Sequence, residues 1–295
     1  MDQNTDYIPK KQLEATTGVL YLVGTPIGNI GDFSPRARYV LSNVSVIACE
    51  DTRYSGQFLK SCQIKANLLS FHKHNNYKRI PKLLELLNKG ENIALITDAG
   101  LPGISDPGED LVKATIKSGH KVICIPGPCA ATTALVASGL PTHRFCFEGF
   151  LPSKAKDRKS ILNIISQEKR TTVIYESPHK LLKLLKNLSD FCGEKRPLQI
   201  AREITKIHEE QIGSTIGEVL KYFSENKPRG EFTLVLGGAT QVEKEISNSE
   251  LISKIKVHLN NKESTSDAIR KISVETGYSK NFLYSLIHQN KKNDS

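Results

Sequence analysis

Short apolar runs and amphipathic stretches alternate along the first 240 residues of the chain. GVLYLVG at 18–24 and NIALIT at 92–97 are continuous apolar runs of strand length. YKRIPKLLELLNKG at 77–90 instead repeats its leucines at helical spacing, and the alternation continues to EFTLVLGG at 231–238. Alternating strands and helices predict an α/β fold with a mainly parallel sheet and helices on its faces.

Two stretches of the chain mark boundaries between predicted domains. GLPTH at 139–143 breaks a small-residue helix ahead of a new strand, and polar QVEKEISNSE is typical of a linker. Beyond it, two short helices joined at Gly277 and Tyr278 are expected. The predicted organisation is a polar N-terminal tail over 1–17, an α/β domain over 18–140, a second α/β domain over 141–240, a linker over 241–250 and a small helical module over 251–295.

Composition narrows the class of protein. No apolar run approaches the roughly 18 residues that a membrane span needs, so no membrane partner is expected. The polar start of the chain lacks the apolar core of a secretory signal. The six cysteines form no C-x-x-C pair and no zinc spacing. We therefore expect free thiols, no metal site and a location in the reducing cytoplasm.

The net charge of +10 is distributed over the whole chain. It divides into +3 over residues 1–140, +5 over 141–240 and +2 over 241–295. The densest local group, here called the basic cluster, lies in SKAKDRKS and consists of Lys154, Lys156, Arg158 and Lys159. Such a cluster suits a polyanionic partner, and it is equally typical of a solvated helix start.

Three loops rich in glycine and proline follow predicted strands. They are GTPIGNIGD at 24–32, TDAGLPGISDPG at 97–108 and PGPCAA at 126–131. In open α/β sheets, ligands bind in the crevice at the carboxyl ends of the strands. The spacing fits neither G-x-G-x-x-G nor a P-loop, so these loops do not indicate a dinucleotide or nucleoside-triphosphate site. A long ordered loop of this composition is typical of a functional site.

Eight motifs of the chain together resemble one protein family. In order, they are VGTPIGNIGD, ACEDTR, ITDAGLPGISDPG, IPGPCA, FEGFLP, YESPHKL, AREITKIHEE and GEFTLVLGG, and they span residues 18–240. Together they resemble the tetrapyrrole-methylase superfamily and, more closely, its ribosomal RNA branch, the small-subunit methyltransferase I family. Any single motif is weak, but eight in one order are highly specific.

The resemblance implies a two-domain fold, a cofactor and a reaction. S-adenosylmethionine (SAM) would lie in a cleft between two α/β domains, and relatives carry a similar small C-terminal module. The methyl group would pass to the ribose 2′-oxygen of a cytidine in the decoding region of 16S rRNA, within the 30S subunit. Relatives are homodimers, and the basic cluster is then expected to contact RNA.

Site residues carried over from the family lie in loops of both domains. The implied cofactor-binding residues are Pro26, Gly28, Asp98, Ala99, Gly100, Leu101, Cys129, Ala130, Glu176, Ser177, Pro178, Ala201 and Glu231. The chain departs from the family pattern in having Leu101 and Gly103 where relatives commonly have threonine and a larger apolar residue. Cys129 stands where serine is usual, which puts one side-chain contact with the cofactor in doubt.

Methyl transfer from a sulfonium needs in-line positioning of the acceptor and removal of its proton. The residues predicted to line the acceptor side of the cleft are Glu50, Arg53, Glu203 and Lys206. The other candidates for the base or an orienting group are Asp51, His72, His74 and Glu210. Structural roles stay open, because Glu50 and Asp51 suit a helix cap and REITKIHEE suits a salt-bridged segment.

Two other functions remain possible from the sequence. A methyltransferase of the same fold could act on a small tetrapyrrole or corrinoid. A non-catalytic protein could bind nucleic acid through its terminal helices, although SKNFLYSLIHQ carries only Lys280 as a fixed positive charge.

Overall fold

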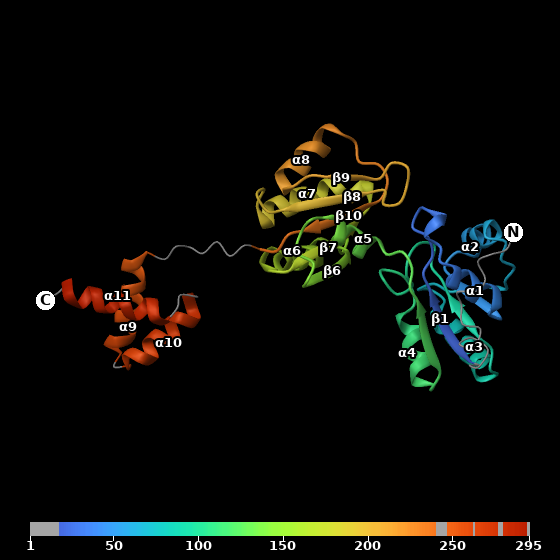
Figure 1. The fold of residues 1–295 in the computed structure, drawn as a ribbon, viewed down its shortest axis with the longest axis horizontal. Coiled ribbons are helices and arrows are strands. Elements are labelled where there is room, and N and C mark those ends of the chain that lie inside the picture. Colours follow the sequence, from blue (N-terminus) through green and yellow to red (C-terminus); the bar gives the residue numbers. More distant parts are fainter. Residues whose placement is uncertain (1–17, 240–246, 262, 277–279, 294–295) are drawn as a thin grey trace. The chain divides into compact units, whose positions relative to one another are not determined.

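The computed structural model describes residues 18–239, 247–261, 263–276 and 280–293. The predicted tail at 1–17 and most of the predicted linker therefore lie outside the described residues. The chain divides into two compact units, Met1–Ala239 and Thr240–Ser295. The first unit contains two β-sheets, each covered by helices on both faces (Figure 1).

The first sheet has the parallel arrangement that the sequence predicts. Its order is β3-β2-β4-β1-β5, and every neighbouring pair is parallel. The strands are β1 (Val19–Val23), β2 (Val46–Cys49), β3 (Leu68–Ser70), β4 (Ile93–Leu95) and β5 (Lys121–Ile125). The strands at its centre are apolar throughout because helices cover both faces. The helices are α1 (Pro35–Asn43) and α2 (Thr52–Ser61) on one face and α3 (Asn76–Asn88) and α4 (Glu109–Lys117) on the other.

Helix α1 begins as its sequence indicates. The Ser34 hydroxyl accepts a hydrogen bond from the Ala37 amide, and Pro35 occupies the first helical position, where no amide hydrogen is needed. Ala37, Val40 and Leu41 recur at helical spacing and are buried against the sheet. The predicted cap and its amphipathic helix are confirmed.

Neighbouring strands β1 and β4 direct the chain to opposite faces of the sheet. The segment after β1 forms η2 (Ile30–Asp32) and then α1, whereas the segment after β4 leads to α4 on the other face. A crevice opens where connections diverge in this way. The two loops are fixed to each other, because Thr25 donates to the Gly100 carbonyl (3.0 Å) and Gly100 donates back (3.2 Å).

The second sheet is mixed, so the prediction of a mainly parallel sheet is wrong there. Its order is β6-β7-β10-β8-β9; β6 and β7 are parallel, and the other neighbouring pairs are antiparallel. The strands are β6 (Phe145–Phe150), β7 (Thr171–Glu176), β8 (Leu198–Arg202), β9 (Glu210–Ile212) and β10 (Phe232–Leu236). The last strand inserts between β7 and β8. A strand that is buried on both faces is apolar whether it runs parallel or antiparallel to its neighbours. The apolar pattern therefore does not predict the direction of the strand.

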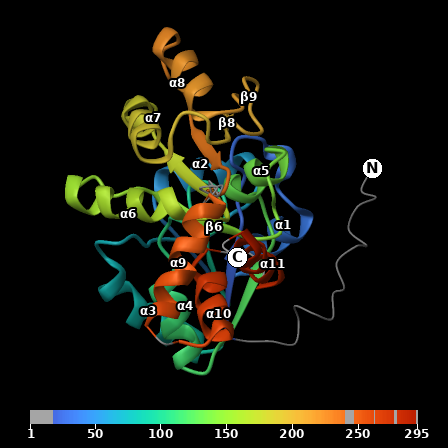
Figure 2. The same cartoon turned by 90° about the vertical axis from the view of Figure 1, so that its left-hand side faces the viewer.

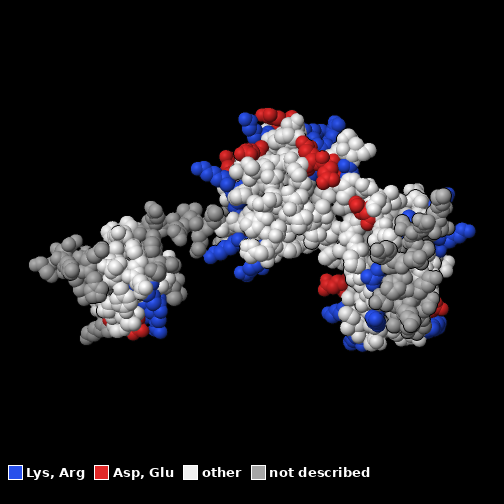
Figure 3. Space-filling view, in the orientation of Figure 1, with Lys and Arg blue, Asp and Glu red and all other residues white. Residues whose placement is uncertain are grey.

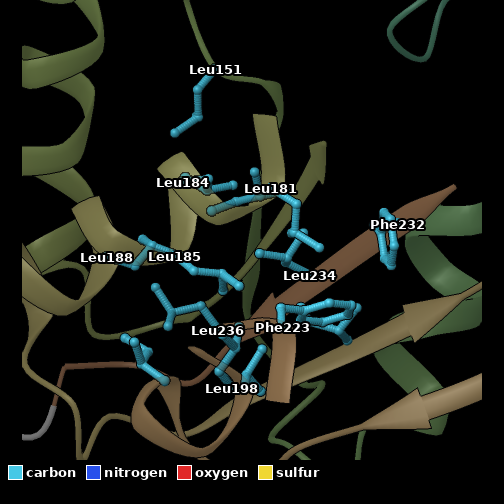
Figure 4. Close-up of a cluster of buried hydrophobic side chains, with 14 of the residues drawn as sticks. Leu151, Leu181, Leu184, Leu185, Leu188, Leu198, Phe223, Phe232, Leu234 and Leu236 are labelled. Carbon is cyan, nitrogen blue, oxygen red and sulfur yellow. The ribbon is translucent and has the colours of Figure 1, made fainter. Parts of the chain in front are cut away.

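Three helices lie on one face of this sheet (Figure 1, Figure 2), and a leucine-rich core packs between them and the sheet. The helices are α6 (Ala155–Gln167), α7 (Pro178–Cys192) and α8 (Ile216–Glu225). Leu184 and Leu185 of α7 are fully buried in one cluster with Leu234 and Leu236 of β10 (Figure 4). This core anchors the strands whose ends form the wall of the cleft described below.

Helix α5 (Ala130–Ala137) covers the other face of the second sheet. Ala131 and Ala134 pack with Val173 of β7 and Val235 of β10. The sequence placed this helix in the domain over 18–140, so that boundary needs correction: the chain passes to the second sheet before α5. Glycine and proline at 139–143 show only where the helix ends. The domain to which a helix belongs depends on the surface against which it packs.

The C-terminal unit is a separate bundle. Its helices are α9 (Asn248–Asn260), α10 (Thr265–Thr276) and α11 (Lys280–Asn293). Leu251, Ile269 and Leu283, one from each helix, are fully buried together. Helix α9 was not predicted, and it begins inside the segment expected to be the linker, with Ser247 accepting from the Glu250 amide. The predicted joint at 277–278 lies outside the described residues, and no helix in the described part is long and apolar enough to cross a bilayer.

Candidate active site

A cleft of about 470 Å³ lies at the carboxyl end of the first sheet, facing the second sheet. Its lining comes from the loops after β1, β2, β4 and β5 and from β6, β7, β8 and β10 with their adjoining loops. The lining residues are Ile27, Glu50, Asp98, Ala99, Gly100, Leu101, Ile104, Ser105, Asp106, Cys129, Ala130, Phe150, Tyr175, Glu176, Ser177, Pro178, Ala201, Ile204, Glu231, Phe232 and Thr233. The volume is in the range of small-ligand and cofactor sites.

Nearly all residues predicted to bind the cofactor line this one cleft. The lining includes Asp98, Ala99, Gly100, Leu101, Cys129, Ala130, Glu176, Ser177, Pro178, Ala201 and Glu231. Pro26 and Gly28 do not line it, although Ile27 between them does. Gly28 lies instead against the opposite domain, where a Cβ would be 2.5 Å from Cγ of Lys206. The glycine therefore permits a close approach between the domains.

The four predicted catalytic residues occupy different places. Glu50 lines the cleft, whereas Arg53 does not. The side chain of Arg53 is 88% exposed and pairs with Asp51 at 2.7 Å. Asp51 is the cap of α2, accepting from the Arg53 amide at 2.8 Å, so the structural role left open for Asp51 is confirmed.

Glu203 and Lys206 lie at the rim of the cleft. Lys206 binds Glu203 and the lining residue Glu231, each at 2.9 Å. Partial burial lowers the pKa of Lys206, but hydrogen bonds to Glu231 and Glu203 outweigh this and leave its pKa raised. Lys206 is therefore a cation at neutral pH, which suits phosphate contact better than proton abstraction. Arg202 and Glu210 pair at 3.0 Å. The REITKIHEE segment is therefore also salt-bridged, which is the structural role that the sequence left open.

The basic cluster does not act as one surface. Lys154, Lys156 and Lys159 are exposed at the start of α6, but the Arg158 side chain is only 7% exposed. Its guanidinium lies 3.4 Å from Glu176 and donates to Asn187. The prediction that Arg158 contacts RNA is therefore wrong, because its charge faces inward and is paired. On the face drawn in Figure 3, the positive side chains of residues 18–239 lie in several separate groups.

The polar lining of the cleft is acidic. Among the described residues, the lining has five carboxylates, those of Glu50, Asp98, Asp106, Glu176 and Glu231, and no lysine or arginine. Oδ1 of Asp98 is buried and has no hydrogen-bond partner within the described part of the chain. Burial raises the pKa of Asp98, against a hydrogen bond from the Asp51 backbone. A buried acceptor without a donor is costly and is typical of a site that a ligand completes.

Sequence reasoning missed several lining residues. Burial, followed by the charges of Glu50 and Asp98, raises the pKa of Asp106 to about 6, against the charge of Lys73. Burial also raises the pKa of Tyr175, whose hydroxyl accepts from the Ala131 amide. Asp106 is the second aspartate of TDAGLPGISDPG, a loop that the sequence predicts to be functional. No sequence pattern indicates that this aspartate is buried.

Aromatic and aliphatic side chains form the rest of the missed lining. Phe150 is 59% exposed at the cleft, and its ring lies 5.6 Å from that of Tyr175. Ile104, Ile204 and Phe232 complete an apolar surface. Phe150 belongs to the FEGFLP motif, so its place in a family motif is the sequence signal that marks it as a lining residue.

Comparisons with known proteins agree with this architecture. The family model described as Tetrapyrrole (Corrin/Porphyrin) Methylases matches residues 19–220. Ribosomal RNA small subunit methyltransferase I from Synechocystis sp. is 45% identical over 270 residues, which cover 91% of this chain and 97% of the relative. The protein of the same name from Escherichia coli O157:H7 is 46% identical over 231 residues, covering 78% and 81%.

A solved structure shares the fold at lower identity. It is uroporphyrin-III C-methyltransferase from Thermus thermophilus complexed with S-adenosyl homocysteine. It matches with a TM-score of 0.51 and 18% identity, covering 74% of this chain and 96% of that one. The family model, the two relatives and the shared fold lead to one conclusion: the chain belongs to the tetrapyrrole methylase family and, within it, to the ribosomal RNA small subunit methyltransferase I family.

Proposed function

We propose that this protein transfers a methyl group from SAM to the ribose 2′-oxygen of a cytidine in the decoding region of 16S rRNA. The names of the relatives support the small-subunit rRNA as substrate. The cytidine and the 2′-oxygen rest on the motif resemblance. The observation that carries the proposal is the acidic cleft, whose lining in the described part of the chain has five carboxylates and no lysine or arginine.

The lining fits SAM better than a phosphate-bearing cofactor. A sulfonium and an ammonium group give SAM two positive charges beside one carboxylate, so carboxylates at the lining favour it. Phosphates would instead be repelled, because they need arginine, lysine or backbone donors. Asp98 offers a buried oxygen that lacks a donor. The eleven predicted cofactor residues that line the cleft remain assigned to this role as part of the proposal.

The chain's own residues position the reaction. The bound cofactor would supply an activated methyl group on sulfur. The reciprocal hydrogen bonds between Thr25 and Gly100 hold the first and second loops in one arrangement, which supports in-line placement of the acceptor. Ile104, Phe150 and Phe232 line the apolar side of the cleft and would exclude water once a ligand covers them.

Charges at the rim favour RNA over a tetrapyrrole. A polycarboxylate tetrapyrrole would bring its acid groups against the acidic lining. A nucleotide can insert its ribose and leave its phosphates outside, where the exposed Lys73 lies near enough to act on Asp106 and Lys206 binds the lining residue Glu231. We therefore prefer the rRNA substrate to the small-molecule alternative.

A transfer assay with tritiated SAM tests the proposal. Purified protein is offered 30S subunits carrying unmethylated 16S rRNA, free 16S rRNA or uroporphyrinogen. Label is expected in the rRNA of the 30S subunits. Label in uroporphyrinogen alone would establish the tetrapyrrole alternative, and the absence of label from every acceptor would leave the non-catalytic alternative.

Three exposed lysines are proposed to contact RNA phosphates. Replacing Lys154, Lys156 and Lys159 together with glutamine should weaken binding of 30S subunits. Each neutralised phosphate adds about 0.7–0.9 to the slope of log K against log salt, so the slope should flatten by about 2. Affinity measured from 50 to 200 mM salt checks this.

A matched control removes the same charge elsewhere. Lys60, Lys113 and Lys117 are exposed lysines of the first domain, and replacing all three should leave the salt slope unchanged. Equal effects of the two triple variants would show that net charge, and not the α6 surface, determines RNA binding.

A cytoplasmic location and a homodimer complete the proposal. The six cysteines are free thiols, which suits a reducing compartment. The homodimer rests on the motif resemblance. Light scattering should then give a mass of twice 32.7 kDa.

A further inference from the structure

Three carboxylates meet on the first-domain side of the cleft. Glu50 follows β2, Asp98 follows β4, and Asp106 lies farther along the same loop as Asp98. All three line the cleft, and the charges of Glu50 and Asp98 act on Asp106. This arrangement places one carboxyl group under the influence of two neighbours of like charge.

Three of the four other acidic lining residues have partners, and within the described part of the chain Glu50 is the exception. Glu176 is bound to Arg158, Glu231 to Lys206, and Asp98 to the Asp51 backbone. Within the described part of the chain, no residue hydrogen-bonds or ion-pairs with Asp106. Its carboxylate is therefore available to a ligand in the cleft.

The loop around Asp106 is held in a strained conformation. Ser105 has a φ of 64°, a left-handed value that a non-glycine residue seldom adopts. A Cβ on Gly149, at the irregularity in β6, would lie 2.8 Å from the Ser105 hydroxyl oxygen. The loop thus rests closely on the second domain, and Pro107 restricts the backbone after Asp106. Strain of this kind is typical of residues fixed for function.

The charged surroundings of Asp106 come from four elements. Glu50, Asp98 and Lys73 contribute charge from the first domain, and Tyr175 faces it from β7. Burial and the two carboxylates outweigh Lys73, so the pKa of Asp106 is about 6. At pH 7 to 8 the group is still mostly ionised, yet it binds a proton more strongly than an ordinary aspartate, which is what a general base needs.

We propose that Asp106 is the proton acceptor of the methyl transfer. Its carboxylate takes the proton of the ribose 2′-hydroxyl while that oxygen forms the new bond to the methyl carbon. The bond between carbon and sulfur breaks, and its electron pair stays on sulfur. The products are a 2′-O-methyl ribose, a neutral thioether and protonated Asp106. This assignment rests on the proposed function, and it makes Glu50 a positioning residue that acts through its charge on Asp106.

The pH dependence of the rate follows from this assignment. Asp106 accepts a proton only when it is ionised, so the single-turnover rate should fall as the pH falls through about 6. The charge of Glu50 raises the pKa of Asp106, so Glu50→Gln should move the acidic limb of the pH profile to lower pH.

The test compares wild type, Asp106→Asn, Asp106→Glu and Glu50→Gln with tritiated SAM and unmethylated 30S subunits from pH 5 to 8. Asp106→Asn should lower the single-turnover rate by about 100-fold or more, because general-base contributions are about 10²–10⁴-fold. Asp106→Glu should keep more of the rate than Asp106→Asn does, and its rate should again fall towards acidic pH. All rates are measured at saturating SAM, with the SAM affinity of each variant determined by calorimetry, because each lining carboxylate also favours SAM binding. Thermal unfolding separates a loss of catalysis from a loss of folding.

Three outcomes would overturn the assignment. Asp106→Asn could retain the wild-type rate. Glu50→Gln could abolish the reaction while Asp106→Asn only shifts the limb, which would make Glu50 the base. Asp106→Asn could fail to fold while Asp106→Glu folds but shows an unchanged pH profile and no rate loss. Methylation of 30S subunits by the wild type tests the proposed function separately, so the two failures are distinguishable.

Discussion

Replacing Arg158 with methionine should lower the free energy of unfolding by about 3 kcal/mol, which corresponds to a Tm lower by about 6–12 °C. The side chains of Arg158 and Glu176 are only 7% and 4% exposed, and they pair at 3.4 Å. Removal of the guanidinium leaves a buried carboxylate with the Ser177 amide and hydroxyl as its remaining donors. Breaking one side of a buried ion pair is far more costly than losing a surface pair. Thermal and urea unfolding measure the loss.

Two further variants make this prediction specific. Lys156→Met changes an exposed cation on the same helix and should alter stability by less than about 0.5 kcal/mol. Adding Glu176→Gln to Arg158→Met should recover part of the lost stability, because the unpaired charge is then gone. If Arg158→Met unfolds like wild type, the guanidinium is not buried against Glu176.

Replacing Gly127 with alanine should weaken SAM binding by at least about 10-fold, with a stability loss of about 1–3 kcal/mol. A Cβ at Gly127 would lie 2.8 Å from Cα of Gly24, and a Cβ at Gly24 would lie 2.7 Å from Cα of Gly127. Both contacts are with backbone, so the loops after β1 and β5 must separate. Cys129 and Ala130, which line the cleft, would move with the second loop. Calorimetric titration with SAM measures the effect.

Gly56 provides the matched control. It lies inside α2, and a Cβ there would be 3.5 Å from its nearest neighbour, Leu68, which is an ordinary contact. Gly56→Ala should leave SAM affinity unchanged and raise stability by about 0.5–1 kcal/mol, because alanine suits a helix better than glycine. Equal affinities for SAM in the Gly127 and Gly56 variants would contradict the close approach of the two loops.

The first sheet and most of the cleft could be predicted from the sequence because each has a local signature. A central parallel strand is apolar throughout, as in NIALIT, and the loop after it needs glycine and proline to approach a ligand. The residues that the motifs supplied, including Asp98 and Cys129, therefore meet at one cleft. The strand-end loops indicated where a ligand binds, and the family resemblance supplied the individual residues.

Other features depend on packing between distant segments. The insertion of β10 between β7 and β8, and the pairing of α5 with the second sheet, leave no periodic signal. The burial of Arg158 is an exception, because helical spacing indicates it. Arg158 lies four and seven residues before Leu162 and Ile165, on the buried face of α6, and so belonged with the core side of that helix.

The most direct test of the central claim is to identify the methylated nucleoside. Unmethylated 30S subunits are incubated with the protein and SAM, the 16S rRNA is digested to nucleosides for mass spectrometry, and the position is mapped by primer extension that stops at ribose methylation. We expect one 2′-O-methylcytidine in the decoding region with the wild-type protein and much less at limiting SAM with Gly127→Ala. A methyl group on a base, on a nucleoside other than cytidine, or nowhere in the rRNA would contradict it.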